Sequence, residues 1–142
     1  MNTQELKGIN KNNIVLGPKY FESKRINKFK SMYDSKTENT IVMVNLDRAT
    51  VYEAKDFSEY MEDLIKNNKT KLIIDIENVY FMDSVFFGTL IKFLKQVTKL
   101  NGHIKLIIDH KSKPELLAIS NFEGIFEIYQ NLFDALNTNK PS

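Results

Sequence analysis

The residues of this 142-residue chain best suited to chemistry are Asp83 and Ser84, an acid and a hydroxyl side by side. They follow an apolar stretch, residues 71–76, that predicts a buried strand, and they precede an apolar pattern typical of a helix. A helix N-terminus has unpaired backbone N–H groups and a partial positive charge, so it stabilises phosphate. Phosphorylation of Ser84 would add about −1.5 to −2 charges to one small surface. We therefore interpret this pair as a switch for protein interaction rather than as a catalytic centre.

Two kinds of pattern alternate along the chain and predict the elements that position this pair. Continuous or alternating apolar runs predict strands, and apolar residues three and four positions apart predict helices. In chain order, the predicted elements are strands over 26–33 and 41–46, a helix over 54–65, a strand over 71–76, a helix over 87–97, a strand over 104–108, a short helix from Ser112 that ends at Gly124, an edge strand over 125–129 and a closing helix over 132–136. This order, β-β-α-β-α-β-α-β-α, predicts an α/β fold with a mixed sheet of about five strands, largely parallel at its centre.

Composition limits the classes of function. The chain has no cysteine, so disulfides and Cys-based zinc sites are excluded, and no apolar run is long enough to span a membrane. The segment Met1–Lys7 lacks the apolar core of a signal peptide, and we expect a cytoplasmic protein. Residues 1–40 hold eight Lys and Arg against four Asp and Glu, whereas residues 41–142 hold twelve against fourteen. Because the basic excess lies near the N-terminus and not on the predicted domain, we expect no direct binding to nucleic acid.

Three groups of residues, taken together with their order, resemble the STAS domain family and, within it, the bacterial anti-sigma-factor antagonists. They are Ile74–Ile76 with Phe81–Ser84 and Gly88, then Leu46–Asp47, then Ser112–Pro114 with Leu117, Gly124–Phe126 and Ile128. The resemblance covers residues 25–137 and implies a single STAS-like domain whose helices pack mainly on one face of the sheet. We predict a mobile leader over residues 1–24 and a C-terminal tail over residues 138–142.

What the resemblance implies is a regulatory cycle. The unphosphorylated protein binds an anti-sigma factor that is itself a serine kinase, and this binding releases a sigma factor. The kinase then phosphorylates Ser84, the complex parts, and a PP2C-type phosphatase resets the cycle. We expect no catalysis, cofactor or metal ion in this chain, and a weak homodimer is left open. The alternative is a STAS scaffold or accessory interaction module in which Ser84 is never phosphorylated.

Four neighbours of Ser84 complete the predicted partner-binding site. Asp83 could cap the helix or orient the Ser84 hydroxyl, and Asp47 follows the second strand and could reach the same rim. Val85 and Phe86 come directly after Ser84, where the family usually has small residues, so their bulk would reshape the docking surface. Phe86 is either an exposed apolar anchor for the partner or a core residue, because it also begins an apolar seam at helical spacing.

Two other classes of protein compete with this interpretation. In a response-regulator receiver, Asp75 at the end of a strand would accept the phosphate, and Lys113-Pro114 would match the receiver's Lys-Pro. Receivers need an acidic pair to hold Mg²⁺, and here Asp47 stands alone. An enzyme is disfavoured because the sequence has no P-loop, Gly-x-Gly-x-x-Gly, nucleophile elbow or His-Glu-x-x-His motif. His103 and His110 have no partners at metal-ligand spacing, and we expect both to be solvated.

Overall fold

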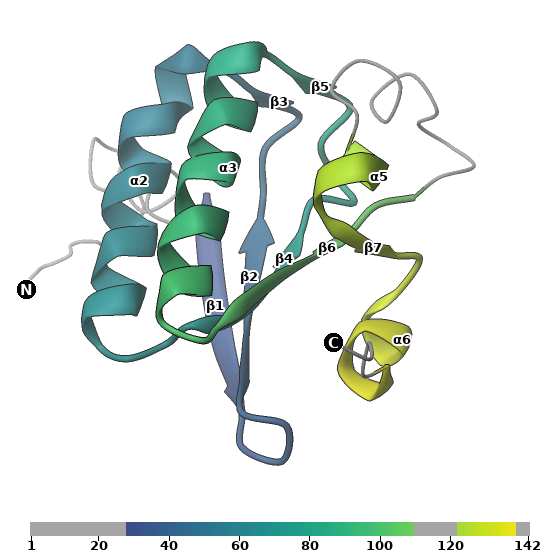
Figure 1. The fold of residues 1–142 in the computed structure, drawn as a ribbon. Coiled ribbons are helices and arrows are strands. Elements are labelled where there is room, and N and C mark those ends of the chain that lie inside the picture. Colours follow the sequence, from purple (N-terminus) through teal and green to yellow (C-terminus); the bar gives the residue numbers. More distant parts are fainter. Residues whose placement is uncertain (1–27, 110–121, 139–142) are drawn as a thin grey trace, which may run out of the picture.

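Five strands form the main sheet, in the order β1-β2-β4-β6-β7 (Figure 1). Their bounds are β1 Phe29–Asp34, β2 Asn39–Val44, β4 Lys71–Asp75, β6 His103–Ile107 and β7 Glu127–Tyr129. β1 pairs with β2 antiparallel, and every later pairing in this sheet is parallel, so the predicted mixed sheet is confirmed. This computed structural model describes residues 28–109 and 122–138. The predicted leader, the start of the short helix at Ser112 and the end of the tail lie outside the described residues.

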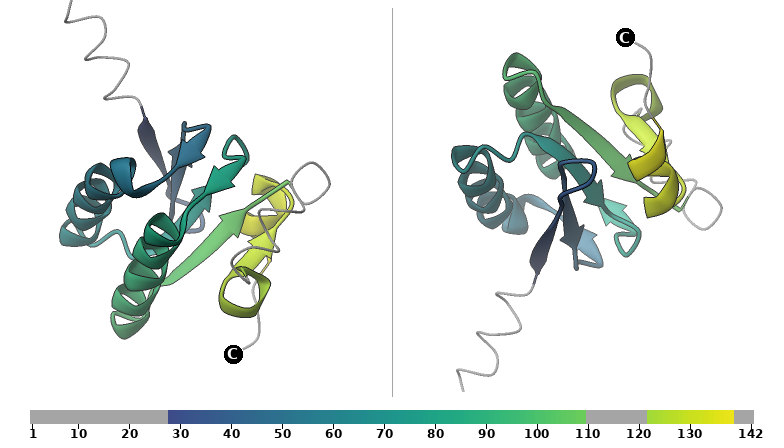
Figure 2. Two further views of the ribbon diagram at one scale, coloured as in Figure 1. Left: turned by 90° about the horizontal axis from the view of Figure 1, so that it is seen from above. Right: turned by 90° about the horizontal axis from the view of Figure 1, so that it is seen from below.

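Two long helices cover one face of the sheet and a short helix lies on the other (Figure 2). The long helices are α2, Val51–Lys66, and α3, Ser84–Lys99, and the short one is α6, Leu132–Asn137. One further helical turn, α5 at Phe122–Ile125, precedes β7. The prediction that the helices pack mainly on one face is therefore confirmed.

Alternation along the strands divides the apolar core into two layers, because successive side chains of a strand point to opposite faces. The side chains packed with α2 and α3 include Val42, Ile74 and Leu106. Their sequence neighbours Ile41, Ile73 and Ile107 pack with α6 instead. β4 is thus buried on both faces, as its near-continuous apolar run predicts.

Two features differ from the sequence predictions. The sequence patterns predict no strand over residues 47–50, but β3, Arg48–Ala49, pairs in parallel with β5, Phe81–Met82. The last predicted strand, 125–129, is shorter than expected: α5 runs to Ile125, Gly124 lies inside it, and only Glu127–Tyr129 pairs with the sheet. Within the described residues, none of the helices has the length and apolar character needed to cross a membrane.

Candidate functional site

Ser84 is the first residue of α3 and is exposed to solvent. The preceding residue, Asp83, is the N-cap, and its Oδ1 accepts a hydrogen bond from the Phe86 amide at 2.9 Å. The Asp83 carbonyl accepts the first intrahelical bond, from the Phe87 amide at 3.1 Å. By the geometry of an α-helix, the amides of Ser84 and Val85 lack an intrahelical acceptor, so they are available to an anion attached to the Ser84 hydroxyl.

The Asp83 carboxylate caps two helices at once. Its second oxygen, Oδ2, accepts a hydrogen bond from the amide of Val51, the first residue of α2, at 2.8 Å. The N-cap of α2 is Thr50, which forms a capping box with Glu53: the Thr50 hydroxyl accepts from the Tyr52 amide and the Thr50 amide donates to Glu53 Oε1 at 2.9 Å. The N-terminal ends of α2 and α3 are therefore joined through one side chain.

The small sheet formed by β3 and β5 brings Asp47 to the same end of the molecule, and Figure 1 shows both strands at the top, level with the first turns of α2 and α3. The Asp47 carbonyl accepts a hydrogen bond from the Tyr80 amide at 2.9 Å, and the Ala49 carbonyl accepts from the Asp83 amide at 3.0 Å. The Arg48 guanidinium lies over the ring of Phe81, 4.2 Å from its centroid, which fixes the two short strands against each other. The segment that begins at Asp47 therefore contacts Asp83 through the Ala49 carbonyl.

Several large apolar side chains are exposed on the segments that meet at this end of the molecule. Val51 is 50% exposed, Tyr52 86%, Tyr80 59% and Val85 48%. We call the surface formed by these four residues with Asp47, Arg48 and Ser84 the Ser84 rim. Scattered exposed apolar residues are ordinary, but exposed aromatic side chains at the end of the molecule that carries a modifiable hydroxyl are compatible with a docking surface.

Phe86 does not belong to this surface. Its side chain is fully buried, and its ring centroid lies 4.8 Å from that of Phe57 in α2. Of the two roles left open for Phe86, the structure supports the core role, and the prediction that it contacts a partner as an exposed anchor is wrong. The reason is the direction in which α3 faces the sheet: its buried residues are Phe86, Leu90, Phe93 and Val97. Phe87 lies on the flank of the helix and packs edge-on against Phe126, with ring centroids 6.1 Å apart.

A family model for the STAS domain matches residues 32–135, which is more than half of the 142 residues. The chain belongs to the STAS domain family. Among curated proteins, this STAS domain is similar to a protein of Thermotoga neapolitana that is provisionally described as an anti-sigma factor antagonist. The two are 24% identical over 93 residues, which cover 66% of this chain and 79% of the relative.

Solved structures show the same fold. A STAS domain protein from Planctomyces limnophilus superposes with a TM-score of 0.64 at 18% identity, covering 76% of this chain and 94% of that one. The anti-sigma factor antagonist SpoIIAA in its unphosphorylated form gives a TM-score of 0.58 at 14% identity, over 75% of this chain and 92% of that one. SpoIIAA of Bacillus in its phosphorylated form gives a TM-score of 0.56 at 14% identity, over 77% of this chain and 96% of that one.

Sequence reasoning missed the part of this STAS domain's rim that α2 and the β4–β5 loop contribute. Val51, Tyr52 and Tyr80 were not singled out. One signal was present: Thr50 followed three residues later by Glu53 is a capping-box pattern, which places the helix start at Val51 and Tyr52 in its first turn. No comparable signal marks Tyr80, because its exposure depends on how the loop after β4 folds back to the Asp47 carbonyl.

The residues considered for other chemistry have structural partners. Asp75 Oδ1 accepts a hydrogen bond from the Glu77 amide at 3.0 Å and so closes the turn after β4. His103 is half-buried and its Nε2 bonds Asn39 Oδ1 at 2.7 Å, so the expectation that it is solvated is wrong. His110 lies outside the described residues. In the described ranges, no three His, Asp or Glu side chains are grouped so that they could hold a metal ion.

Proposed function

We propose that this STAS domain is an anti-sigma-factor antagonist controlled at Ser84. In this proposal the unphosphorylated form binds an anti-sigma factor with serine kinase activity in the cytoplasm, and a sigma factor is released. Phosphorylation of Ser84 ends the binding, and a PP2C-type phosphatase restores it. The observation that carries the proposal is an exposed serine at the N-terminus of α3, next to the exposed apolar side chains of the Ser84 rim.

The residues around Ser84 suit an apolar docking surface, in which a phosphate buried against the partner would be unfavourable. Tyr52 and Tyr80 offer large, rigid contact area, and Val85 places an apolar side chain directly after the serine. Asp47 is exposed on the same rim and is positioned to meet a cationic group of the partner, whereas the Asp83 carboxylate is already committed to two helix amides. The role of Asp83 in the proposal is therefore to hold the first turn of α3, and with it Ser84, in place.

Phosphorylation would act through the interface rather than by refolding the domain. Attraction between phosphate and the N-terminus of α3 contributes only about 0.3–2 kcal/mol and favours the modified domain. Switching a complex from mostly bound to mostly free takes about 5.5 kcal/mol of differential affinity. That difference comes from forcing a phosphate dianion against an apolar partner surface without a compensating cation. The fold likeness to SpoIIAA in both its forms supports this reading of the STAS scaffold.

The first test measures phosphorylation. The protein is incubated with Mg-ATP and a serine-kinase anti-sigma factor from the same organism, and its intact mass is recorded. Wild type should gain one phosphate and Ser84→Ala none. Ser35→Ala is the matched control, because Ser35 is an exposed serine in the turn between β1 and β2. Phosphorylation of Ser84→Ala at the wild-type rate would refute the assignment of the site.

The second test measures binding of the unphosphorylated protein to the same kinase by calorimetry. Ser84→Asp should weaken binding by adding charge, and Tyr52→Ala should weaken it about tenfold or more if Tyr52 is an anchor. Phe133→Ala is the control, because Phe133 is a large apolar residue of α6 that is 73% exposed and lies outside the rim. Equal losses for Tyr52→Ala and Phe133→Ala would place the interface elsewhere.

One observation favours the second candidate, a STAS interaction module that is not phosphorylated. Val85 is β-branched, exposed and adjacent to the Ser84 hydroxyl, so it restricts how closely a kinase active site can approach that hydroxyl. In that case Tyr52→Ala would still weaken partner binding, but no phosphate would be added and Ser84→Ala would bind like wild type. Val85→Ala, which removes this bulk, should then permit phosphorylation that wild type does not undergo.

A further inference from the structure

A second polar site lies at the opposite end of the sheet from Ser84. Lys71 and His103 are the first residues of β4 and β6, whereas the Ser84 rim follows the last residue of β4. Because β4 and β6 are parallel neighbours, their first residues share one edge of the sheet, and Lys71 is in register with His103. This edge opens into a pocket of about 410 Å³, within the range of small-molecule sites.

The pocket is lined by cationic and neutral polar groups. Its lining residues are Lys36, Thr37, Asn39, Lys71, His103, Lys105, Leu136 and Asn137. None of these eight side chains is acidic, although the whole chain has nearly equal numbers of basic and acidic residues. Three carboxylates lie close to the pocket but outside its lining: Asp34 bonds to Thr37, Glu38 pairs with the exposed Lys71 ammonium at 3.4 Å, and Glu127 is in register with Lys105. Exposed pairs such as Glu38–Lys71 are weak, so Lys71 can exchange its partner for a ligand.

Lys105 has a different role from the other two lysines. It is only 5% exposed, and its ammonium donates to the carbonyls of Ala135 at 2.7 Å and Thr138 at 2.8 Å. It therefore holds the C-terminal end of α6 against β6 and forms the wall of the pocket. Its charge stays in the site, but its donors are largely used, which leaves Lys36 and Lys71 as the lysines that can turn to a ligand.

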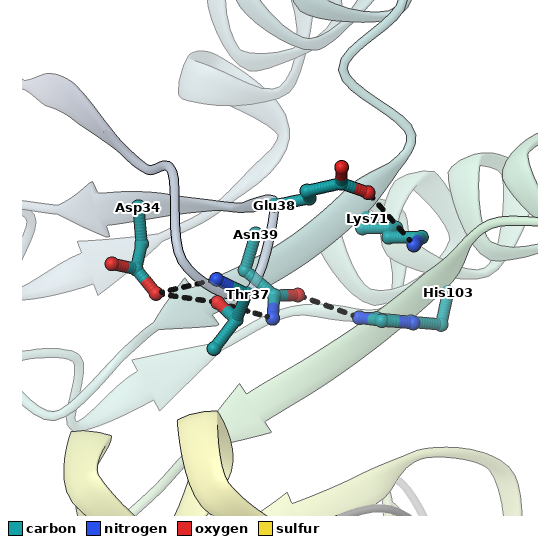
Figure 3. A network of polar contacts seen from close by, with 6 residues as sticks. All are labelled: Asp34, Thr37, Glu38, Asn39, Lys71 and His103. Atoms are coloured by element: carbon teal, nitrogen blue, oxygen red, sulfur yellow. Dashed lines mark hydrogen bonds and ion pairs between the residues drawn. The ribbon is translucent and has the colours of Figure 1, made fainter.

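A chain of hydrogen bonds fixes which ring nitrogen of His103 carries the proton (Figure 3). Asp34 Oδ2 accepts from the Thr37 hydroxyl at 2.5 Å and from the Thr37 amide at 3.2 Å. Because the Thr37 hydroxyl donates its only proton there, it accepts from Asn39 Nδ2 at 3.0 Å. The Asn39 carbonyl oxygen is then turned to His103 and accepts from Nε2–H at 2.7 Å. Nδ1 is thus the nitrogen left to bind a second proton.

We propose that this pocket binds a small oxyanion, with inorganic phosphate as the probe, between the ammonium groups of Lys36 and Lys71 and the imidazole of His103. The charge of the lining carries the proposal, and the relay from Asp34 orients the ring for it. Among the protein groups alone, burial and the neighbouring Lys105 lower the pKa of His103 from its ordinary value, with Lys71 acting in the same direction and Glu127 against it. A bound anion would raise the pKa of His103 again, because its negative charge favours the imidazolium form.

The experiment follows the imidazole of His103 by NMR in the 142-residue protein carrying His110→Gln, which leaves one histidine. The pKa of His103 is measured with increasing sodium phosphate and, in parallel, with sodium chloride at equal ionic strength. Phosphate should raise the pKa by about one unit and the effect should saturate. Chloride should not reproduce it. An identical, unsaturated response to both salts would overturn the proposal.

Two lysine variants and one control locate the effect. Lys36→Gln and Lys71→Gln should each weaken phosphate binding about tenfold, the loss expected for one charge-assisted hydrogen bond. Lys95→Gln is the control, because Lys95 is exposed on α3, on the opposite face of the sheet from His103 and Lys105. Far-UV circular dichroism checks that each variant is folded. If Lys95→Gln weakens binding as much as Lys71→Gln, the response is bulk electrostatics and the pocket is not the site.

Discussion

Removing the Asp83 carboxylate should cost more stability than removing an ordinary helix cap. Asp83 accepts hydrogen bonds from the Phe86 amide at 2.9 Å and from the Val51 amide at 2.8 Å, so it serves the N-termini of α3 and α2 together. One N-cap is worth about 1 kcal/mol, and a negative charge near a helix N-terminus adds about 0.3–1 kcal/mol. With one such hydrogen bond for each of the two helices and the single negative charge counted once, Asp83→Ala should lose about 2–3 kcal/mol, a large share of the total for a domain of this size.

Asp83→Asn separates the two bonds. Because the Phe86 and Val51 amides bond to different oxygens of Asp83, the single carbonyl oxygen of asparagine can replace only one of these acceptors, and its NH₂ group takes the place of the other. The Val51 amide is exposed, and water can replace the lost acceptor, so we expect a loss of only about 1 kcal/mol. Asn131→Ala is the control, because Asn131 caps α6 alone through the Asp134 amide at 2.8 Å and should cost about 1 kcal/mol.

The assay is equilibrium urea unfolding, with amide hydrogen exchange read at Val51 and Phe86. Exchange at both amides should accelerate in Asp83→Ala, and at one of them in Asp83→Asn. The reasoning would be refuted if Asp83→Ala were no less stable than Asn131→Ala, or if exchange at Val51 were unchanged in Asp83→Ala.

Three other substitutions test the description of the fold. Phe86→Ala should lose about 3–5 kcal/mol in urea unfolding because the ring is fully buried, whereas Val85→Ala should change stability by less than about 0.5 kcal/mol. His103→Gln should flatten the fall in Tm on acidification. Burial lowers the pKa of His103 below 6.5, so the unfolded chain binds more protons than the folded one; the contribution of His103 to wild-type stability is therefore full above pH 6.5 and is lost as the pH falls below it. Gly102→Ala should cost about 1–3 kcal/mol, because its Cβ would lie 2.0 Å from the Thr70 carbonyl oxygen and the turn into β6 would have to move.

The sheet and the position of Ser84 were predictable because local signals agree with the fold. The apolar runs at 41–46, 71–76 and 104–108 are three of the five strands, and they lie at the centre of the sheet. Asp83 could be expected as an N-cap because it comes just before an apolar pattern of helical period. Neither inference needs knowledge of distant contacts.

What could not be predicted depends on contacts between distant segments. The sequence allows Phe86 or Phe87 to face the core, since both begin apolar seams at helical spacing, and only the rotation of α3 on the sheet decides between them. The short strands β3 and β5 contain two residues each and carry no periodic signal; they exist because Asp47 and Ala49 carbonyls meet amides more than thirty residues away. The partner of His103, Asn39, is likewise supplied by a different strand.

The geometry around Ser84 predicts that phosphorylation changes affinity far more than stability. A phosphate on Ser84 can accept from the Ser84 and Val85 amides, but it lies beside the Asp83 carboxylate, whose oxygens already hold Phe86 and Val51. Attraction and repulsion therefore oppose each other, and the unfolding free energies of the two forms should differ by less than about 2 kcal/mol. The affinity for the kinase should differ by about 10⁴-fold if the switch is nearly complete. Urea unfolding and calorimetry on both forms make the comparison. If instead phosphorylation destabilised the domain by as much as it weakened binding, the switch would act by unfolding the first turns of α2 and α3, and the interface argument would be wrong.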